Sequence, residues 1–479
     1  MTRFLGPDFL LDTEPARRLY HEVAAGLPIV DYHNHLRPED IAQNRSWESL
    51  GEIWLADDHY KWRLMRWAGI NEERITGSAD FRTKYNAFAT ALPRALGNPV
   101  HHWAHLELWR YFGLGGTVLS PETADHCWEV AGNCLARPDF RARGLLSCMN
   151  VELVATTDDP TDSLEHHRVF AAETDTELRM IPTFRPDRAF AIEAPDFTDW
   201  IERLSACARQ PVRRWDDLLG ALDARLDAFL AAGARAADHG IDCLEAGEEV
   251  SAVKLDAILS ARLEGKYPDE SETAAWRSAL LIALGRAYAA RDMVMQLHIG
   301  ALRNTRSRLL MQVGRDAGGD SIRDRPIAEG LNLLLDRLDR SNELPRTILY
   351  ALNPALNPIL VTTAGNFQDG SRAGKVQAGA AWWFNDQLDG MQSQMTQLSQ
   401  MGLISTFTGM LTDSRSLLSF PRHEYFRRLL CRMLGRWMQD GLVPNDFDAL
   451  AEMVRDICYR TPHAWFARKS VDVGTARLR

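Results

Sequence analysis

Short apolar runs recur along the whole chain of 479 residues, and longer segments with helical spacing separate them. The eight runs are residues 26–33, 151–156, 180–184, 241–244, 293–298, 347–352, 376–382 and 403–407. Residues 215–236 and 273–291 are two of the segments in which leucine, alanine and aromatic residues follow the helical period. Strands that alternate with helices in this way build a parallel sheet, either doubly wound or closed into a barrel.

The gap between the first two runs is the exception to this spacing. Residues 38–148 are too many for one crossover helix, and they are rich in tryptophan, histidine and leucine. We expect a large helical insertion after the first strand, packed over one end of the sheet. The predicted organisation is an N-terminal segment with the first strand (1–37), the insertion (38–148), and the remaining strands with C-terminal helices (149–479). One compact unit is favoured, because no proline-rich linker or low-complexity tract divides the chain.

Charge and cysteine usage narrow the expected partners and compartment. The formal net charge of −10 disfavours binding to nucleic acid, although a few arginines can still form a local anion pocket. No stretch approaches the 18 apolar residues of a membrane span, and the first 20 residues do not resemble a signal peptide. The seven cysteines are scattered without a CxxC pair, which predicts reduced, mostly buried thiols and a cytoplasmic location.

Two histidines two positions apart end the first apolar run, in the order His33, Asn34, His35. Side chains alternate along a strand, so both imidazoles should point the same way while Asn34 points away. The carboxyl end of a barrel strand is where active sites form, and two imidazoles there are suited to share a metal ion. The alternative is a pair of histidines that only form hydrogen bonds.

Two further residues follow other predicted strands. His298 ends the fifth run, and Asp413 follows the eighth. Alone, such a histidine is more often a core residue, and such an aspartate more often caps a helix or forms a turn. Together with His33 and His35 they supply the nitrogen and oxygen ligands that a mononuclear site with an open position needs.

Longer strings of residues resemble one family throughout the chain. The strings are DYHNHL (31–36), DHYKWR (58–63), TTDDP (156–160), TFRPD (183–187), QLHIGA (296–301), AWWFN (381–385), TDSRS (412–416) and PRHEYF (421–426). In this order they resemble the uronate isomerases of the amidohydrolase superfamily. Asn34 departs from the family, in which cysteine is the commoner residue. The resemblance implies a (β/α)8 TIM-like barrel with the helical insertion after its first strand.

The resemblance also implies a reaction. It is the aldose–ketose isomerisation of D-glucuronate to D-fructuronate, and of D-galacturonate to D-tagaturonate, by proton transfer through an enediol. The implied cofactor is one divalent metal ion, with zinc expected, although these ligands do not separate zinc from manganese or iron. Asp413 is a candidate both for metal ligand and for general base. Tyr60 is the alternative proton carrier, with His59 beside it, unless the two only form the face of an amphipathic helix. His298 either completes the metal shell or binds a substrate oxygen.

Arg185 and Arg415 are the candidates for binding the carboxylate of a hexuronate, because a guanidinium group offers a bidentate fork to a planar anion. The alternative for each is a surface salt bridge. Trp382 and Trp383 end the seventh run, and alternation predicts that one lines the pocket while the other packs outward. A small-molecule hexuronate is therefore the expected partner, and a homo-oligomer is the expected assembly.

Two rival functions remain open. The first is a metal-dependent hydrolase of the amidohydrolase superfamily, many of which hold two metals with a bridging lysine or carboxylate on the fourth strand. Around the predicted fourth strand there is no lysine and only Glu245, which disfavours a binuclear site. The second rival is a barrel that binds sugar acids without catalysis. Turnover of a uronate distinguishes both from an isomerase.

Overall fold

Seven parallel strands form one curled sheet in the order β1-β2-β3-β4-β5-β8-β9 in the computed structural model, which describes residues 4–173, 176–242, 244 and 250–467. The strands are β1 (Ile29–Asp31), β2 (Val151–Asp158), β3 (Arg179–Phe184), β4 (Ala236–Ile241), β5 (Val294–Ile299), β8 (Thr347–Ala351) and β9 (Val376–Ala378). The short strands β6 (Ala301–Leu302) and β7 (Ser321–Ile322) form a separate antiparallel ribbon. Consecutive parallel strands in chain order, joined by helices, make this a TIM-like barrel.

The eighth place in the barrel is filled without a regular strand. The prediction of a strand at residues 403–407 is wrong, because Ile404–Thr406 form a 3-10 helix, η7, and Leu403 is exposed. Instead, residues 408–414 run beside the end of β1. The amide of Asp413 donates to the carbonyl of His33 (3.2 Å), and the amide of His35 donates to the carbonyl of Ser414 (2.9 Å). These two hydrogen bonds join residues 408–414 to the segment that follows β1, and so close the barrel.

The fourth strand lies five residues earlier than predicted. Strand β4 spans Ala236–Ile241 and pairs along its whole length with β5, whereas the sequence favoured 241–244. Its alanines and glycine have little apolar bulk, so pairing with a neighbouring strand, rather than composition, selects this segment. The preceding helix is correspondingly shorter than the predicted 215–236: α12 spans Trp215–Ala231, and Gly233 follows it with φ of 100°.

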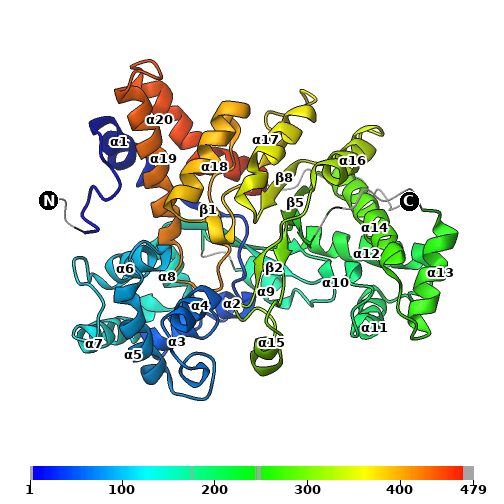
Figure 1. Ribbon diagram of the computed structural model, residues 1–479, viewed down its shortest axis with the longest axis horizontal. Coiled ribbons are helices and arrows are strands. Elements are labelled where there is room, and N and C mark those ends of the chain that lie inside the picture. Colours follow the sequence, from blue (N-terminus) through cyan, green and yellow to red (C-terminus); the bar gives the residue numbers. More distant parts are fainter. Residues whose placement is uncertain (1–3, 174–175, 243, 245–249, 468–479) are drawn as a thin grey trace.

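All regular elements that the structure describes between residues 38 and 148 are helices, and their being an insertion stays a prediction. They are α2 (Pro38–Ala42), α3 (Leu50–Leu55), α4 (His59–Trp67), η2 (Glu72–Arg74), α5 (Phe81–Ala91), η3 (Leu92–Arg94), α6 (Pro99–Phe112), α7 (Ala124–Leu135), η4 (Pro138–Phe140) and α8 (Ala142–Cys148). Helices α3–α7 gather below the sheet in Figure 1. Asp58 caps α4 by accepting hydrogen bonds from the amides of Tyr60 (2.9 Å) and Lys61 (3.1 Å). The boundaries at residues 37 and 148 as domain limits stay a prediction.

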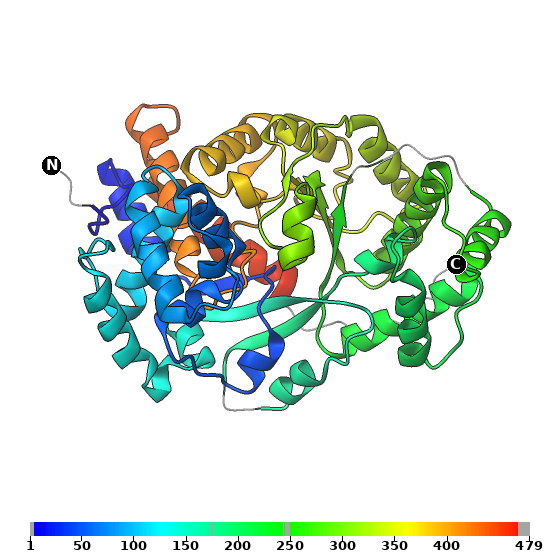
Figure 2. The same ribbon diagram turned by 60° about the horizontal axis from the view of Figure 1, so that its bottom comes forward.

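The helices that follow β2 surround the sheet, and Figure 2 shows those of the second half of the chain arching around it. They are α9 (Glu165–Ala171), α10 (Asp187–Phe190), α11 (Phe197–Ala208), α12 (Trp215–Ala231), α13 (Ala252–Leu263), α14 (Glu270–Ala290), α15 (Ser307–Val313), α16 (Ala328–Asp339), η5 (Pro354–Leu356), α17 (Asn357–Asn366), η6 (Trp383–Asn385) and α18 (Leu388–Met401). In the described part of the chain, no helix has the length and apolar character that a membrane crossing requires.

Strand alternation divides the core into two clusters and aims polar side chains into the barrel. On β5, Met295 and Leu297 belong to the outer cluster under the helices, and Val294 belongs to the inner one. His298 therefore faces inward, where its ring stacks on Tyr350 (centroids 4.3 Å apart). The inner face of the sheet thus supplies the imidazole that the sequence placed at the end of this strand.

The prediction of mostly buried thiols is only partly correct. Cys127, Cys431 and Cys458 are buried, but Cys148 and Cys207 are exposed, and all of them are free. Cys243 lies outside the described residues.

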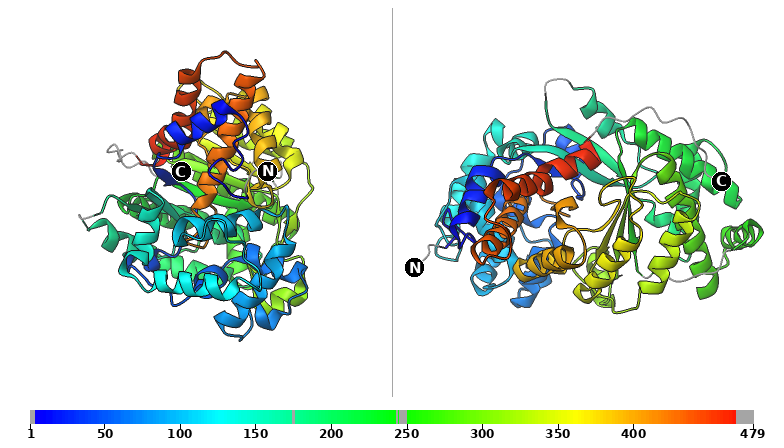
Figure 3. Two further views of the ribbon diagram at one scale, coloured as in Figure 1. Left: turned by 90° about the vertical axis from the view of Figure 1, so that its left-hand side faces the viewer. Right: turned by 90° about the horizontal axis from the view of Figure 1, so that it is seen from above.

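The two ends of the chain pack against each other, as Figure 3 shows for the blue and the orange to red helices. The elements involved are α1 (Glu14–Arg18), η1 (Leu19–Ala24), α19 (Pro421–Gln439), α20 (Phe447–Arg455), η8 (Asp456–Arg460) and η9 (His463–Ala467). The closest approach is at Gly435 of α19, where a Cβ atom would lie 2.5 Å from the backbone nitrogen of Ala16. The backbone of Ala16 cannot move away from such a Cβ atom by a rotamer change, as a flexible side chain could.

Gly435→Ala should therefore lower the stability of the protein by about 1–3 kcal/mol, because overpacking outweighs the better helix propensity of alanine. The measurement is the shift of the thermal unfolding midpoint. Gly132→Ala in α7 is the matched control, since a Cβ there meets nothing within 4 Å. The control should raise stability by about 0.5–1 kcal/mol. Equal behaviour of the two variants would contradict the close packing of α19 on α1.

Candidate active site

The end of β1 and the segment that closes the barrel bring His33, His35 and Asp413 together. Oδ1 of Asp413 lies 3.2 Å from Nε2 of His33 and 3.1 Å from Nε2 of His35. Ligand atoms about 2.1 Å from one cation lie about 3.0–3.4 Å apart at right-angled to tetrahedral geometry. The spacing of these three atoms thus fits one divalent cation, and the three residues form a group that could hold a metal ion.

The protonation states of Asp413 and His35 suit that arrangement, whereas Asp238 and Asp413 raise the pKa of His33 against the effect of burial. Burial alone would raise the pKa of the Asp413 carboxyl, but hydrogen bonds with His33 and His35 hold it well below its usual range. Burial lowers the pKa of His35 to about 4. At neutral pH the site therefore presents a carboxylate beside a neutral imidazole, the forms that ligate metals.

His298 and Asp238 lie on the other side of His33. The His298 and His33 rings are 4.6 Å apart, and Nδ1 of His298 is 2.5 Å from Oδ1 of Asp238. Nε2 of His298 and Nδ1 of His33 are buried and have no hydrogen-bond partner among the described residues. His33, Asp238 and His298 form a second group with metal-ligand spacing, so His33 is common to both groups.

Trp382 and Trp383 both line the cavity, so the prediction that one of them packs outward is wrong. Strand β9 ends at Ala378, and strand alternation no longer applies where the chain turns into η6. Trp383 begins η6 with φ of 48°, which turns its ring to the same side as that of Trp382. Nε1 of Trp382 donates a hydrogen bond to Oδ2 of Asp413 (3.0 Å), and thereby fixes the carboxylate oxygen that the imidazoles do not contact.

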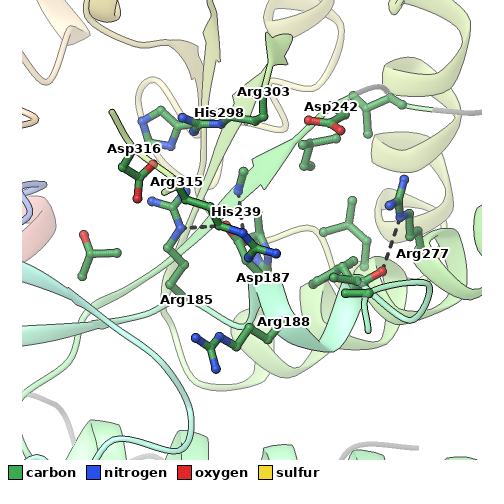
Figure 4. A pocket seen from close by; sticks show the side chains of 18 of the residues that line it. Arg185, Asp187, Arg188, His239, Asp242, Arg277, His298, Arg303, Arg315 and Asp316 are labelled. Atoms are coloured by element: carbon green, nitrogen blue, oxygen red, sulfur yellow. Dashed lines mark hydrogen bonds and ion pairs between the residues drawn. The ribbon is translucent and has the colours of Figure 1, made fainter. Parts of the chain in front are cut away.

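These residues open into a cavity of about 670 Å3, within the usual range of small-molecule sites. In Figure 4, Arg185, Arg303 and Arg315 lie toward the same side of the pocket as His298, whereas Arg277 lies at the opposite end. The predicted site residues that line the cavity are His33, His35, His59, Arg185, His298, Trp382, Trp383, Asp413 and Arg415. A metal-ligand group and several guanidinium groups thus line one cavity.

The two predicted carboxylate-binding arginines differ in their ion pairs with carboxylates of the protein itself. Arg185 contacts two carboxylates, through Nε to Asp187 (2.8 Å) and through Nη1 to Asp238 (2.8 Å). Among the described residues, Arg415 has one ion pair, 3.3 Å from its Nη2 to Oδ2 of the exposed Asp316. The guanidinium group of Arg415 is therefore the more available of the two to a carboxylate ligand.

Comparison with known proteins settles the family. The family model described as glucuronate isomerase matches residues 1–466. The chain belongs to the glucuronate isomerase family. It is 53% identical to the uronate isomerase of Vibrio vulnificus (strain YJ016) over 98% of this chain and 100% of the relative, and 52% identical to that of Serratia proteamaculans over 98% and 99%. The protein is thus an isomerase.

Solved structures agree with this family. The uronate isomerase from Thermotoga maritima superposes with a TM-score of 0.91 at 36% identity, covering 97% of this chain and 100% of its own. The glucuronate isomerase from Caulobacter crescentus gives 0.90 at 26% identity, with 99% of each chain covered. A putative metal-dependent hydrolase from Lactobacillus casei shares the fold alone, with a TM-score of 0.52 at 12% identity.

Tyr60 is the predicted site residue that the structure does not place among those lining the cavity of this isomerase. Its hydroxyl donates to Oδ2 of Asp386 (3.3 Å), and the guanidinium of Arg422 lies 4.9 Å from the centre of its ring. Burial raises the pKa of Asp386 to about 8. His59, which does line the cavity, stacks on Tyr60 (5.0 Å). The predicted proton-carrier role of Tyr60 has no direct contact with the cavity to support it.

Residues near the site that were missed from the sequence include Asp238, Arg303, Arg315 and Asp316. Asp238 was missed because β4 was placed too late in the chain, and Glu245, the acidic residue considered there, lies outside the described residues. The other three belong to the long connection between β5 and α16, where no apolar period places them in space. Nη1 of Arg63 in α4 donates to the carbonyl of Gly318 (3.1 Å), which fixes this connection against the helix that carries His59.

A buried charged cluster lies behind α4. Nζ of Lys61 is 2.5 Å from Oδ2 of Asp58 and 3.8 Å from Oε2 of Glu107, and all three side chains are almost completely buried. Burial raises the pKa of Glu107 to about 7, although Lys61 opposes the shift. Because this folded-state pKa lies above the ordinary value of 4.5, the stability that Glu107 contributes is present below about pH 4.5 and is lost as the pH rises through about 7.

Glu107→Gln should therefore remove a fall in stability of about 2–3 kcal/mol between pH 5 and pH 8. The measurement is the unfolding midpoint of both proteins at several pH values. Glu424→Gln is the control: Glu424 is also buried, but Arg110 and Arg428 hold its pKa below the usual range against the effect of burial. The control should be destabilised by the same amount at pH 5 and pH 8. Parallel curves for wild type and Glu107→Gln would contradict the raised pKa.

Proposed function

We propose that this isomerase interconverts hexuronates, D-glucuronate with D-fructuronate and D-galacturonate with D-tagaturonate, through an enediol. The observation that carries the proposal is an anionic Asp413 between two imidazoles, in a cavity that Arg415 also lines. Such a site has a base, a place for an electrophile and a guanidinium for the substrate carboxylate. The names of the related proteins support the choice of uronates.

The residues at the site fit a single divalent metal ion, which we propose to be zinc. His33, His35 and Asp413 supply the spacing, and the unpartnered, buried Nε2 of His298 supplies a further donor. When bound, the ion supplies a Lewis acid for a carbonyl oxygen or a pair of hydroxyl oxygens. A second ion at His33, Asp238 and His298 is disfavoured, because the guanidinium of Arg185 already lies 2.8 Å from Asp238.

Asp413 is the proposed general base. Its carboxylate removes the proton from the carbon beside the carbonyl and, after exchange with solvent, delivers a proton to the former carbonyl carbon, while the hydroxyl proton passes to the former carbonyl oxygen. Both carboxylate oxygens are held, one by the imidazoles and the other by Trp382, so the group keeps its direction through the transfer. His59 is a second candidate for moving a proton, because burial lowers its pKa to about 4 and leaves a neutral imidazole in the cavity.

Arg415 is the proposed anchor for the substrate carboxylate, and Arg185 acts mainly through the carboxylates that it contacts. A carboxylate ligand replaces the long contact of Arg415 with Asp316 and gains a bidentate pair. Trp382 and Trp383 supply the apolar wall behind the sugar chain. The cytoplasmic location and the homo-oligomeric state stay predictions.

The test is incubation of the protein with D-glucuronate or D-galacturonate in D2O, followed by NMR. The expected result is the corresponding ketose, with deuterium from the solvent at the carbon to which the proton returns. Parallel incubation with a sugar lactone tests the rival hydrolase. Hydrolysis of the lactone without conversion of either uronate would overturn the proposal.

A further inference from the structure

Asp238 lies between ionisable groups from two neighbouring strands near the candidate metal site. Its side chain is completely buried, and strand β4 directs it between β3 and β5. Oδ1 lies 2.5 Å from Nδ1 of His298, and Oδ2 lies 2.8 Å from Nη1 of Arg185. Oδ2 is also 3.8 Å from Nδ1 of His33. One carboxylate thus contacts one imidazole and one guanidinium, and lies close to a second imidazole.

The contact between Asp238 and His298 decides which ring nitrogen carries the proton. A carboxylate only accepts hydrogen bonds, so Nδ1 of His298 carries the hydrogen and Nε2 keeps its lone pair. This Nε2 is buried and has no hydrogen-bond partner in the part of the chain that the structure describes, and the ring lines the cavity. His33 is less closely engaged: its Nδ1 lies 3.8 Å from Oδ2 of Asp238 without a hydrogen bond, and its Nε2 lies 3.2 Å from Oδ1 of Asp413.

Arg185 holds Asp238 in this position. It reaches Oδ2 of Asp238 from β3, and its own Nε is fixed by Asp187, which begins α10. The space between Arg185 and Asp187 is tight, since a Cβ at Gly240 would lie 2.9 Å from Nη2 of Arg185. The guanidinium group therefore has little freedom to leave the carboxylate.

We propose that Asp238, held by Arg185, is a positioning residue that orients His298 so that its Nε2 faces a cation bound at the site. This inference rests on the proposed function only in placing a divalent cation at the site. Carboxylates that orient metal-ligating histidines from behind affect metal affinity although they do not touch the metal.

The test is the affinity of the protein for Zn²⁺, measured by competition with a coloured chelator and without any sugar. Asp238→Asn keeps the shape of the side chain but removes its negative charge, and its amide nitrogen cannot accept the hydrogen bond from Nδ1 of His298. The expected result is a loss of Zn²⁺ affinity of about 10–100-fold. Asp158→Asn is the matched control, because Asp158 is also a buried carboxylate near a histidine (His167, 3.7 Å) but ends β2 away from the cavity lining. The control should bind Zn²⁺ as the wild type does.

A second variant keeps the inference testable if Asp238→Asn does not fold. Arg185→Met leaves the carboxylate in place but removes its support, and should weaken Zn²⁺ binding by about threefold to tenfold. Wild-type Zn²⁺ affinity in Arg185→Met, or in a folded Asp238→Asn with only a lower unfolding midpoint, would overturn the proposal. Since no uronate is present, failure of the isomerase assay has no bearing on this result.

Discussion

Replacing Asp413 with asparagine should lower kcat for uronate isomerisation by about 1,000-fold or more, the range expected for the loss of a general base. The variant keeps the shape of the side chain, and asparagine tolerates the φ of 48° that Asp413 adopts. What is lost is the negative charge between His33 and His35. The measurement is NMR turnover of D-glucuronate at saturating substrate, together with deuterium exchange from D2O into recovered substrate.

The exchange experiment separates the two roles of Asp413. If Asp413 is the base, exchange and turnover fall together, even when added Zn²⁺ fills the site. If it is only a ligand, added Zn²⁺ restores both. Trp382→Phe is the graded control, because it keeps an aromatic ring in the wall but removes the hydrogen bond to Oδ2 of Asp413, and it should cost about tenfold or less. A fully active Asp413→Asn would refute the proposed chemistry.

The sequence predicts best those parts of the site that depend on local spacing. His33 and His35 are two positions apart just beyond the end of β1, and both line the cavity, as their spacing predicts. Asn34 turns away, as predicted, and its amide donates to Asp31 (2.9 Å). His298 follows from the same rule on β5. Most strands of the barrel were located because buried parallel strands consist of continuous apolar residues.

The strand predictions that were wrong concern segments whose structure depends on tertiary contacts rather than on local composition. Strand β4 contains Asp238, His239 and Gly240, which are poor strand formers, and it becomes a strand because β5 pairs with it along its whole length. Residues 403–407 have the composition of a strand but turn back as η7, and the less apolar segment after them closes the barrel. No window of sequence carries information about which partner strand is next to it.

One wall of the cavity could not be predicted for a related reason. It is formed where the connection between β5 and α16 meets helix α4 of the segment between β1 and β2. Arg66 of α4 donates to the carbonyl of Ala317 (2.5 Å), and Arg415 reaches Asp316 of the same connection. Segments from three distant parts of the chain therefore determine where Arg415 points, so its residue type was predictable from the family strings but its orientation was not.

Replacing Arg415 with methionine should lower kcat/KM for a uronate by about 1,000-fold, or about 4 kcal/mol, since it leaves the substrate carboxylate without its charged partner. Methionine keeps much of the apolar stem, so packing changes little. Arg415→Lys keeps the positive charge but loses the bidentate guanidinium, so its kcat/KM should lie between those of the wild type and Arg415→Met. The measurement is steady-state kinetics with D-glucuronate and with D-glucose, which has no carboxylate.

The ratio of kcat/KM for D-glucuronate to kcat/KM for D-glucose distinguishes carboxylate binding by Arg415 from a structural salt bridge. The wild type should prefer the uronate, and Arg415→Met should lose most of this preference, whereas damage to the fold lowers both rates alike. Asp316→Asn is the control, because it removes the only ion pair that the structure gives Arg415 in its described residues. That control should stay within about tenfold of the wild type, the range of an exposed ion pair. If Arg415→Met kept the uronate preference, or if Asp316→Asn matched its loss, Arg415 would be a partner of Asp316 rather than of the substrate.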